Sequence, residues 1–362
     1  MSFQPLEGRL VVDVTSSLAG PTCTQLLASL GAEVVKIEPP GGDHARAWGP
    51  PFLDGEGAMF LAANAGKRSL VLDLSSAEGR AELMRLVENA DVFVQSLRPG
   101  VAEQHGFGAE ALRERRPDLV YCSIGAFGST GPLRTEAGYD PLLQAASGIM
   151  SVTGADGMPP VRVGVSLIDL STGLWAAFGI LAALGRGGGA TVEVSLYETA
   201  LWLLGYQIVG YLGTGEMPGR EGSAFPQIAP YQVFATRDGE LMIVAGNDKL
   251  FRALSRVLGV GEDERFGTNP DRVRHRTELA NMIEERTRRW RTDDLLEALS
   301  TAGVPASPVR NVGEATEHPQ TLALGILQQL GSFTAVAQPL SIDGERILHP
   351  APPPQLDDYR AR

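Results

Sequence analysis

The chain has 362 residues, of which 43% are hydrophobic and 20% charged, as in an ordinary globular protein of one large domain or two smaller ones. The formal net charge of −12 argues against non-specific binding of nucleic acid, because such binding needs an excess of basic residues. The two cysteines, Cys23 and Cys122, have no metal-ligand spacing and are too few for a disulfide framework, which fits a reducing cytoplasm.

No segment of the sequence indicates export or a membrane span. Residues 1–10 lack the charged and then apolar pattern of a signal peptide. The apolar run from Leu174 to Leu184 is shorter than the roughly 18 residues that a membrane span needs, and it is typical of a buried helix. We therefore expect a cytoplasmic protein that does not enter a membrane.

The first half of the chain alternates between strand and helix patterns. Strands are expected at 9–14, 33–38, 70–74, 91–95, 119–124 and 191–195. Helices are expected at 22–30, 76–90, 110–116 and 174–184. This alternation predicts an α/β domain with a parallel sheet, whose ligand site lies at the carboxyl ends of the strands. The first turn lacks the Gly-x-Gly-x-x-Gly pattern of a dinucleotide site, so we expect no NAD.

The pattern changes after about Tyr206. Residues 210–226 are rich in glycine without a clear period and are interpreted as linker and loop. Further on, Arg237-Asp238-Gly239 indicates a hairpin, and helices are expected at 250–258, 274–289 and 292–302, with a short strand at 309–312. The predicted division is a large domain (1–205), a linker (206–228), a small α+β domain (229–328) and a C-terminal return to the large domain (329–362).

Asp169 is the carboxylate that stands out. It precedes Ser171 and Thr172, which are good helix-start residues, and the apolar run that begins at Leu174. A carboxylate at a helix N-terminus is favoured by about 0.3–1 kcal/mol, because unpaired N–H groups and the helix dipole attract it. Asp169 is therefore either a helix cap or a reactive carboxylate at a strand-to-helix turn.

The other motifs give weaker indications. Lys67 and Arg68 follow Gly66, which fits either a solvated turn or a phosphate contact. The sequence has neither a Gly-x-Ser-x-Gly elbow nor a P-loop. We expect no metal, because none of the histidines pairs with another ligand at metal spacing; they are His44, His105, His275, His318 and His349. The residues alone thus predict an α/β enzyme with an anionic ligand.

Taken together, several of these segments resemble the class III CoA-transferases, a family that includes formyl-CoA and carnitine CoA-transferases and, as a branch, the 2-methylacyl-CoA racemases. The resemblance covers nearly the whole chain. It is carried by Asp13 with Ala19-Gly20-Pro21, residues 31–38, Gly42-Asp43, Asn64 with Lys67-Arg68-Ser69, Leu72-Asp73, Arg98-Pro99-Gly100, Gly138-Tyr139-Asp140, Pro159-Pro160, Asp169 with Gly173, and Gly303-Val304-Pro305.

The resemblance implies a catalytic role for Asp169, with Tyr139 and Asp140 in support. The carboxylate attacks the thioester carbonyl of an acyl-CoA donor, passes through an anhydride and an aspartyl-CoA thioester, and gives CoA to a carboxylic acid acceptor. A carboxylate nucleophile resembles both the leaving and the incoming acid, so the thioester energy is kept. Water must be excluded from such a site.

The resemblance also implies contacts to coenzyme A, the one cofactor expected. These are Leu18, Pro39, Leu72, Asp73, Leu74, Ser75, Ser96, Leu97, Arg98, Gln104, Glu136, Ala137, Gly138 and Tyr139. Members that act on formyl-CoA have basic residues at Pro39, Ser75, Gln104 and Ala137. We therefore expect other basic residues to contact the phosphates, with Arg46, Lys67, Arg68 and Arg98 as the candidates.

Tyr139 separates the two branches of the family. Racemases have a histidine at this position, and an unactivated tyrosine, with a pKa near 10, is a poor base at neutral pH. This favours transferase over racemase or a non-catalytic acyl-CoA-binding protein. Residues 222–227 replace the glycine-run lid of the formyl-CoA enzymes, which suggests a larger acid than formate or oxalate. The family fold implies a Rossmann-like large domain built from both chain ends, an inserted smaller α+β domain, and an interlocked homodimer.

Overall fold

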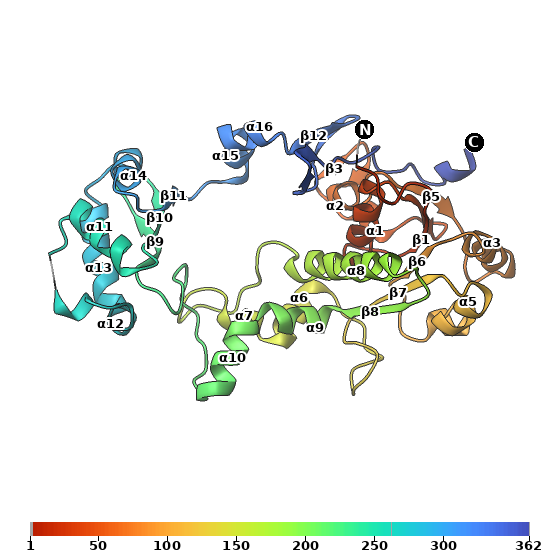
Figure 1. The fold of residues 1–362 in the computed structure, drawn as a ribbon, viewed down its shortest axis with the longest axis horizontal. Coiled ribbons are helices and arrows are strands. Elements are labelled where there is room, and N and C mark those ends of the chain that lie inside the picture. Colours follow the sequence, from red (N-terminus) through yellow and green to blue (C-terminus); the bar gives the residue numbers. More distant parts are fainter. Residues whose placement is uncertain (1–2, 262, 362) are drawn as a thin grey trace. The chain divides into compact units, whose positions relative to one another are not determined.

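A computed structural model describes residues 3–261 and 263–361, which divide into two compact units (Figure 1). The first comprises Met1–Ile149, Arg162–Glu216 and Gln320–Arg362. The second comprises Met150–Val161 and Met217–Pro319. The predicted α/β class is confirmed, because the first unit is built on a parallel sheet with helices on both faces.

Six parallel strands form the sheet of the first unit, in the order β5-β2-β1-β6-β7-β8. They are β1 (Leu10–Val14), β2 (Glu33–Glu38), β5 (Arg68–Val71), β6 (Val92–Gln95), β7 (Val120–Gly125) and β8 (Thr191–Ser195). The chain runs outward from β1 through β2 to β5 and then returns to place β6 on the other side of β1. The order therefore reverses between β1 and β6, and parallel sheets bind ligands at such a switch point, at the carboxyl ends of the strands.

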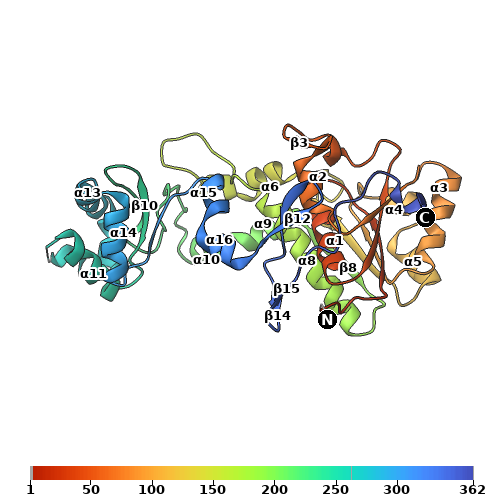
Figure 2. The ribbon, with the colours of Figure 1, turned by 90° about the horizontal axis from the view of Figure 1, so that it is seen from above.

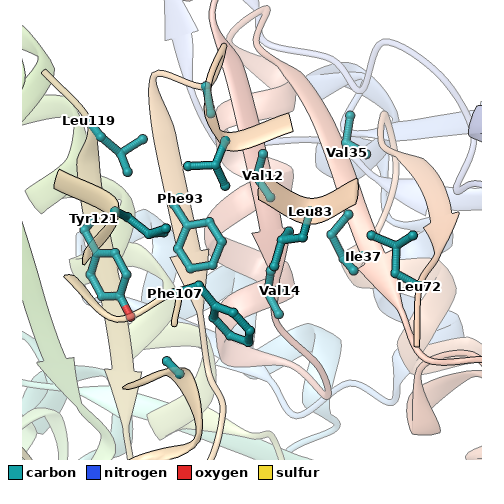
Figure 3. Close-up of a cluster of buried hydrophobic side chains, with 14 of the residues drawn as sticks. Val12, Val14, Val35, Ile37, Leu72, Leu83, Phe93, Phe107, Leu119 and Tyr121 are labelled. Atoms are coloured by element: carbon teal, nitrogen blue, oxygen red, sulfur yellow. The ribbon is translucent and has the colours of Figure 1, made fainter. Parts of the chain in front are cut away.

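Helices cover both faces of this sheet. Helices α1 (Ala19–Ser29) and α8 (Leu167–Gly185) lie on one face, and α3 (Ala77–Val87) and α5 (Ala109–Arg115) lie on the other (Figure 1). Alternate strand residues point to opposite faces, so Val12 and Phe93 join the core under α3 and α5. The ring centroids of Phe93 and Tyr121 are 5.4 Å apart in this cluster (Figure 3).

A glycine allows the N-terminal turns of α1 and α8 to lie close together. A Cβ atom on Gly173 would lie 2.6 Å from the carbonyl oxygen of Ala19, closer than real Cβ atoms come. Only glycine therefore permits this approach, which brings the start of α8, where Asp169 lies, beside the start of α1.

The remaining elements of the first unit are short, and several of them complete its edges. They are η1 (His44–Ala47), β3 (Phe52–Leu53), β4 (Glu56–Gly57), α2 (Ala58–Ala63), α4 (Val101–Gln104), α6 (Asp140–Ser147), α9 (Leu196–Leu203), α10 (Gly205–Thr214), β12 (Leu327–Leu330), β13 (Phe333–Val336), β14 (Ser341–Ile342), β15 (Glu345–Arg346) and η3 (Asp358–Ala361). The last of these lies near α3 (Figure 2), and Arg360 pairs there with Glu82. The carboxylates of Asp357 and Asp358 accept the N–H groups of Val71 and Ser69, which covers the exposed edge of β5.

The second unit packs helices against a three-stranded antiparallel sheet. The strands are β9 (Tyr231–Ala235), β10 (Glu240–Val244) and β11 (Ala306–Pro308). The helices are α11 (Asp248–Leu258), η2 (Glu264–Phe266), α12 (Asn269–Arg274), α13 (Arg276–Thr287), α14 (Thr292–Thr301) and α15 (Val312–Glu317). Helices α7 (Ile149–Val152) and α16 (Pro319–Leu324) contain the points in the sequence at which the chain passes from one unit to the other. Buried Arg272 pairs with Asp248 at 2.6 Å.

Three of the differences from the sequence-based expectations have a clear physical reason. Helix α8 begins at Leu167 rather than near Leu174, because Asp140 caps its first turn from a distant part of the chain. Part of the expected linker is helix α10, which ends at Gly215 in a left-handed conformation (φ 76°). A strand was expected at 309–312. The strand in this region is β11, at Ala306–Pro308, because these residues pair with β10.

Helix α8 is also longer than the apolar run predicted. Among the described residues it is the one helix long and apolar enough to cross a membrane by length and composition, a test that core helices of globular proteins also pass. It packs along α1 and carries buried residues that include Ile168, Ala176 and Ile180.

Candidate active site at the carboxyl end of the sheet

A cleft of ≈ 360 Å³ lies at the switch point of the sheet, and Asp169 lies in its wall. The turns after β1, β6 and β7 form the other walls together with the segment that leads into α6. The residues that these segments contribute include Ser16, Ser17, Ala19, Gly20, Ser96, Leu97, Arg98, Gly125, Ala126, Glu136, Ala137, Gly138 and Tyr139. Residues distant in sequence therefore meet around one half-buried carboxylate.

Asp140 caps the helix that carries Asp169. The Asp140 side chain is buried at the start of α6, and its Oδ2 accepts the N–H groups of Ile168 at 2.8 Å and of Asp169 at 3.2 Å. Its Oδ1 accepts from Gln144 Nε2 at 2.6 Å. No described residue donates a hydrogen bond to the Asp169 carboxylate. The interpretation of Asp169 as the helix cap is therefore wrong, since Asp140 has that role.

This arrangement changes the acidity of Asp169. Burial disfavours the charged form, and the nearby carboxylate of Asp140 adds like-charge repulsion, so the pKa of Asp169 is raised to about 7. A carboxylate with few hydrogen bonds and little water around it is a better nucleophile than a solvated one. A strongly shifted carboxyl group in a cleft is also the usual sign of a functional site.

Two residues at the start of α1 line the same cleft. Ala19 and Gly20 begin α1 and line the cleft, and the first N–H groups of an α-helix have no partner within the helix. No described residue accepts a hydrogen bond from the N–H of Leu18, Ala19 or Gly20. Such free donors suit a negative charge that develops on an oxygen atom near Asp169.

A second cavity of ≈ 320 Å³ continues the cleft along the sheet edge. Ser16, His44, Ser96 and Leu97 line both cavities, so the two join as one groove across the ends of β5, β2, β1 and β6. The structure brings together in this groove most of the residues expected to contact CoA, namely Pro39, Leu72, Asp73, Leu74, Ser75, Ser96, Leu97, Arg98, Glu136, Ala137, Gly138 and Tyr139.

Two of the expected phosphate contacts are buried in ion pairs instead. Lys67 Nζ lies 3.1 Å from Asp13 Oδ2 and 2.8 Å from Asn64 Oδ1, and burial lowers its pKa to about 8. Arg46 pairs with Glu38 and Glu56, both at 2.7 Å. Neither side chain has a charge to offer a phosphate, because each is already neutralised inside the protein.

The other expected contacts outside the groove are Arg68, Leu18 and Gln104. The Arg68 guanidinium lies 4.2 Å from the centre of the Tyr359 ring and donates to the Tyr359 carbonyl. Leu18 is buried, and Gln104 lies exposed at the end of α4. Of the four basic residues predicted to hold phosphates, Arg98 is therefore the one that lines the groove.

Sequence reasoning missed His44 and Ser17. The histidines were considered only as metal ligands, yet His44 lies exposed where the two cavities join. Its position directly after Gly42-Asp43, at the start of η1, was the available signal. Within residues 3–261 and 263–361, no group of three or more histidine, cysteine, aspartate or glutamate side chains is placed to hold a metal ion.

Known proteins are similar to this chain in sequence and in fold. The profile of CoA-transferase family III matches residues 6–358. The succinate–glutarate CoA-transferase of Agrobacterium fabrum is 39% identical, over 99% of this chain and 94% of that protein. The acetyl-CoA:oxalate CoA-transferase of Acetobacter aceti is also 39% identical, with the same coverage of both chains. The human succinyl-CoA:glutarate CoA-transferase is 34% identical, over 99% of this chain and 85% of that one. The crystal structure of a CaiB/BaiF family protein from Brucella suis superimposes with a TM-score of 0.88 at 39% identity, covering 99% of this chain and 97% of that one.

Proposed function

The chain belongs to CoA-transferase family III, and on that premise we propose that it moves CoA from an acyl-CoA donor to a carboxylic acid through the side chain of Asp169. The observation that carries the proposal is the state of the Asp169 carboxylate. It is half-buried, accepts no hydrogen bond from a described residue, and lies at the end of a groove that crosses the switch point of the sheet.

The proposed reaction has four steps. An Asp169 oxygen attacks the thioester carbonyl carbon of the donor, the C–S bond breaks, and CoA leaves as a thiolate. The thiolate attacks the Asp169 carbonyl carbon of the mixed anhydride, which releases the donor acid and leaves an aspartyl-CoA thioester. The acceptor carboxylate then displaces the thiolate to form a second anhydride. The thiolate finally attacks the acceptor carbonyl, which forms the new thioester and frees Asp169.

The surroundings of Asp169 support these steps. Each attack places negative charge on a carbonyl oxygen, and the free N–H groups at the start of α1 lie in the same cleft. No step requires a proton or water. Water would instead hydrolyse the anhydride, so we propose that the bound substrates and the apolar side chains of the cleft exclude it.

We propose that CoA lies along the groove with its thiol end at Asp169. The nucleotide end then lies in the cavity formed by Pro39 and residues 72–75, and the diphosphate lies near the junction of the cavities. Arg98 and His44 are the proposed phosphate contacts, because both line the groove and have no ion-pair partner among the described residues. This assignment replaces the expected contacts of Arg46 and Lys67.

The names of the relatives suggest which substrates to test first. The relatives are named for succinyl-CoA or acetyl-CoA as donor and for glutarate or oxalate as acceptor. We propose that the acceptor of this chain is a dicarboxylic acid larger than oxalate, in the size range of glutarate. The relatives are named as transferases, so racemisation is not favoured.

We further propose that the protein is a homodimer whose large domain contains both chain ends. Helices α8, α9 and α10 present an apolar surface that includes Phe178, Trp202, Val209 and Leu212, and the last two are 71% and 76% exposed. An exposed apolar area of this kind marks an interaction surface. The residues of α8 that pack on α1 support its role as a core helix rather than a membrane span.

Trapping of the intermediate tests the proposal. The protein is incubated with succinyl-CoA, treated with hydroxylamine and digested, and the peptide that carries residue 169 is examined by mass spectrometry. We expect a hydroxamate on Asp169, because hydroxylamine attacks both the anhydride and the thioester. Asp169→Ala should lose transfer to every acid, whereas Asp118→Asn, an exposed aspartate before β7, should retain it. Full activity of Asp169→Ala would rule the proposal out.

A further inference from the structure

The turn between β1 and α1 holds a strained residue in the wall of the cleft. Ser17 has a φ of 69°, in the left-handed region, which costs a residue other than glycine about 1–2 kcal/mol. Strain of this kind persists only where the surrounding structure imposes it, and it gathers at functional sites. Ser17 precedes the N–H groups at the start of α1 and lines the cleft with Asp169.

Two buried side chains impose this conformation. The Ser17 N–H donates to Asp43 Oδ1 at 3.2 Å, and Asp43 Oδ2 pairs with Lys36 Nζ at 2.8 Å. Lys36 Nζ also donates to the carbonyl oxygen of Thr15 at 2.8 Å. One ion pair therefore holds the turn at both ends, through the carbonyl of Thr15 and the N–H of Ser17.

The pair is well suited to hold the backbone. The side chains of Lys36 and Asp43 are 0% and 1% exposed, so water does not compete for their hydrogen bonds. Asp43 Oδ1 accepts a second backbone N–H, that of Ala45 at 3.0 Å, which fixes the direction of its carboxylate. Asp13 and Glu38 also face Lys36 and favour its charged form.

We propose that Lys36 and Asp43 are positioning residues for the reaction at Asp169. They act through the backbone and not at the reacting atoms: Lys36 is fully buried, and Asp43 borders the ≈ 320 Å³ cavity but is only 3% exposed. They hold residues 15–18 in the shape that places the N–H groups of α1 beside the oxygen atoms that become charged in each step. This inference rests on the proposed CoA transfer.

Double variants separate positioning from stability. Lys36→Met/Asp43→Asn and Lys36→Met/Asp43→Ala both remove the ion pair without leaving a buried lysine unpaired. The asparagine oxygen still accepts the Ser17 N–H, whereas alanine cannot. We expect kcat to fall about tenfold more in the alanine variant than in the asparagine variant, the equivalent of about one hydrogen bond, and KM for the acyl-CoA to change less than kcat does.

An ion pair at the other end of the same sheet, with side chains 51% and 15% exposed, provides a control for position in the sheet. Asp91 accepts the N–H of Leu10 at 2.9 Å and pairs with Arg9 at 2.7 Å, at the amino end of β1. Arg9→Met/Asp91→Ala therefore removes the same kinds of contact away from the cleft. It should leave kcat and KM unchanged.

A glycine at position 17 gives a rescue. Glycine adopts a positive φ without a Cβ penalty, so it needs less help from Asp43. Ser17→Gly added to Lys36→Met/Asp43→Ala should therefore restore part of kcat. Because glycine at a positive φ also raises the stability of the protein, kcat is measured under conditions in which every variant is fully folded.

Hydrogen exchange provides a readout that does not depend on activity. We expect the peptide that covers residues 15–18 to exchange faster in Lys36→Met/Asp43→Ala than in Lys36→Met/Asp43→Asn. Equal exchange in these two variants would overturn the inference, whether or not the protein transfers CoA. Equal kcat values in the two variants would also overturn it. Absence of transfer by the unmodified protein would instead count against the proposed function.

Discussion

The carboxylate of Asp140 accepts the backbone N–H of Asp169, at a distance of 3.2 Å. One acidic residue thereby caps the helix that carries the other. The hydrogen bonds from Ile168 and Asp169 satisfy free donors at the start of α8, so those donors are not available to the Asp169 carboxylate. The same contact brings a second negative charge close to Asp169, and both effects leave its carboxylate poorly stabilised and more reactive.

The first prediction concerns the pH dependence of transfer. The pKa of Asp169 is about 7, and only the ionised side chain is a nucleophile. We expect kcat/KM to fall about tenfold per pH unit below pH 7 and to level off above it, measured as initial rates between about pH 5 and 9. An acid limb near the ordinary carboxyl pKa would contradict this.

The second prediction concerns Asp140→Asn. The substitution removes the like charge that helps raise the pKa of Asp169 and keeps an oxygen that accepts the N–H groups of Ile168 and Asp169. We expect the acid limb of the pH–rate profile to move to lower pH, with the fold retained. As a control, Asp140→Ala also removes the cap and should lower the stability of the protein by about 1 kcal/mol in a denaturant melt. An unmoved acid limb in Asp140→Asn would show that burial alone sets the pKa.

The third prediction is that Asp169→Asn stabilises the protein at alkaline pH. The folded pKa of about 7 exceeds the ordinary value of 3.8, so the folded state binds more protons than the unfolded state between these limits. The stability of the unmodified protein therefore falls as pH rises through this window, and the neutral amide avoids that loss. We expect Asp169→Asn to be more stable by about 1–2 kcal/mol at pH 8, after allowance for solvent screening, and equally stable near pH 4. Denaturant melts at both pH values measure the difference in the free energy of unfolding between the variant and the unmodified protein. The same difference at pH 4 and pH 8 would contradict a coupling between the pKa of Asp169 and stability.

The fourth prediction concerns the phosphate contacts. Arg98→Ala and His44→Ala should each raise KM for the acyl-CoA about tenfold, the loss of one charge-assisted contact, with kcat little changed. Steady-state kinetics and calorimetric titration with CoA measure this. Arg115→Ala, an exposed arginine on α5, is the control that should leave both constants unchanged. A drop in kcat alone would place Arg98 or His44 at the reacting carbonyl rather than at the phosphates.

The fifth prediction concerns assembly. Val209→Glu and Leu212→Glu place a charge on the exposed apolar surface of α10 and should convert the proposed dimer to monomers, as read by light scattering after gel filtration. Gln207→Glu changes the same helix at a polar, half-buried position and should leave the mass unchanged. A dimer that survives both apolar substitutions would locate the interface elsewhere.

Sequence patterns were most reliable for buried elements. Val12 and Val35 belong to short apolar runs, which fit the almost fully buried strands β1 and β2, and the helical period of Leu83 and Val87 fits α3. These patterns are local, because each element must bury its own apolar side chains. Helix α10 lacks this signal, since none of its residues is buried and its glycines lower helix propensity.

The candidate site could also be predicted only in part from the sequence. The position of Asp169 at the start of a helix, and the grouping of the strand-end turns, followed from the sequence because strands and helices alternate along it. The pairing of Arg46 and Lys67 did not follow from the sequence: Arg46 pairs with the nearby Glu38 and Glu56, and Lys67 pairs with Asp13, 54 residues away. No local pattern distinguishes a lysine that faces a ligand from one that faces a buried aspartate.

The amino-acid order alone thus determined the class of fold, the resemblance to a transferase family and the choice of Asp169, because these depend on periodicity and on motifs of neighbouring residues. The tertiary structure decided which carboxylate caps α8, which cations line the groove, and how Ser17 is held. Those features depend on contacts such as Asp140 to Ile168 and Asp43 to Ser17, between segments that only the folded sheet brings together.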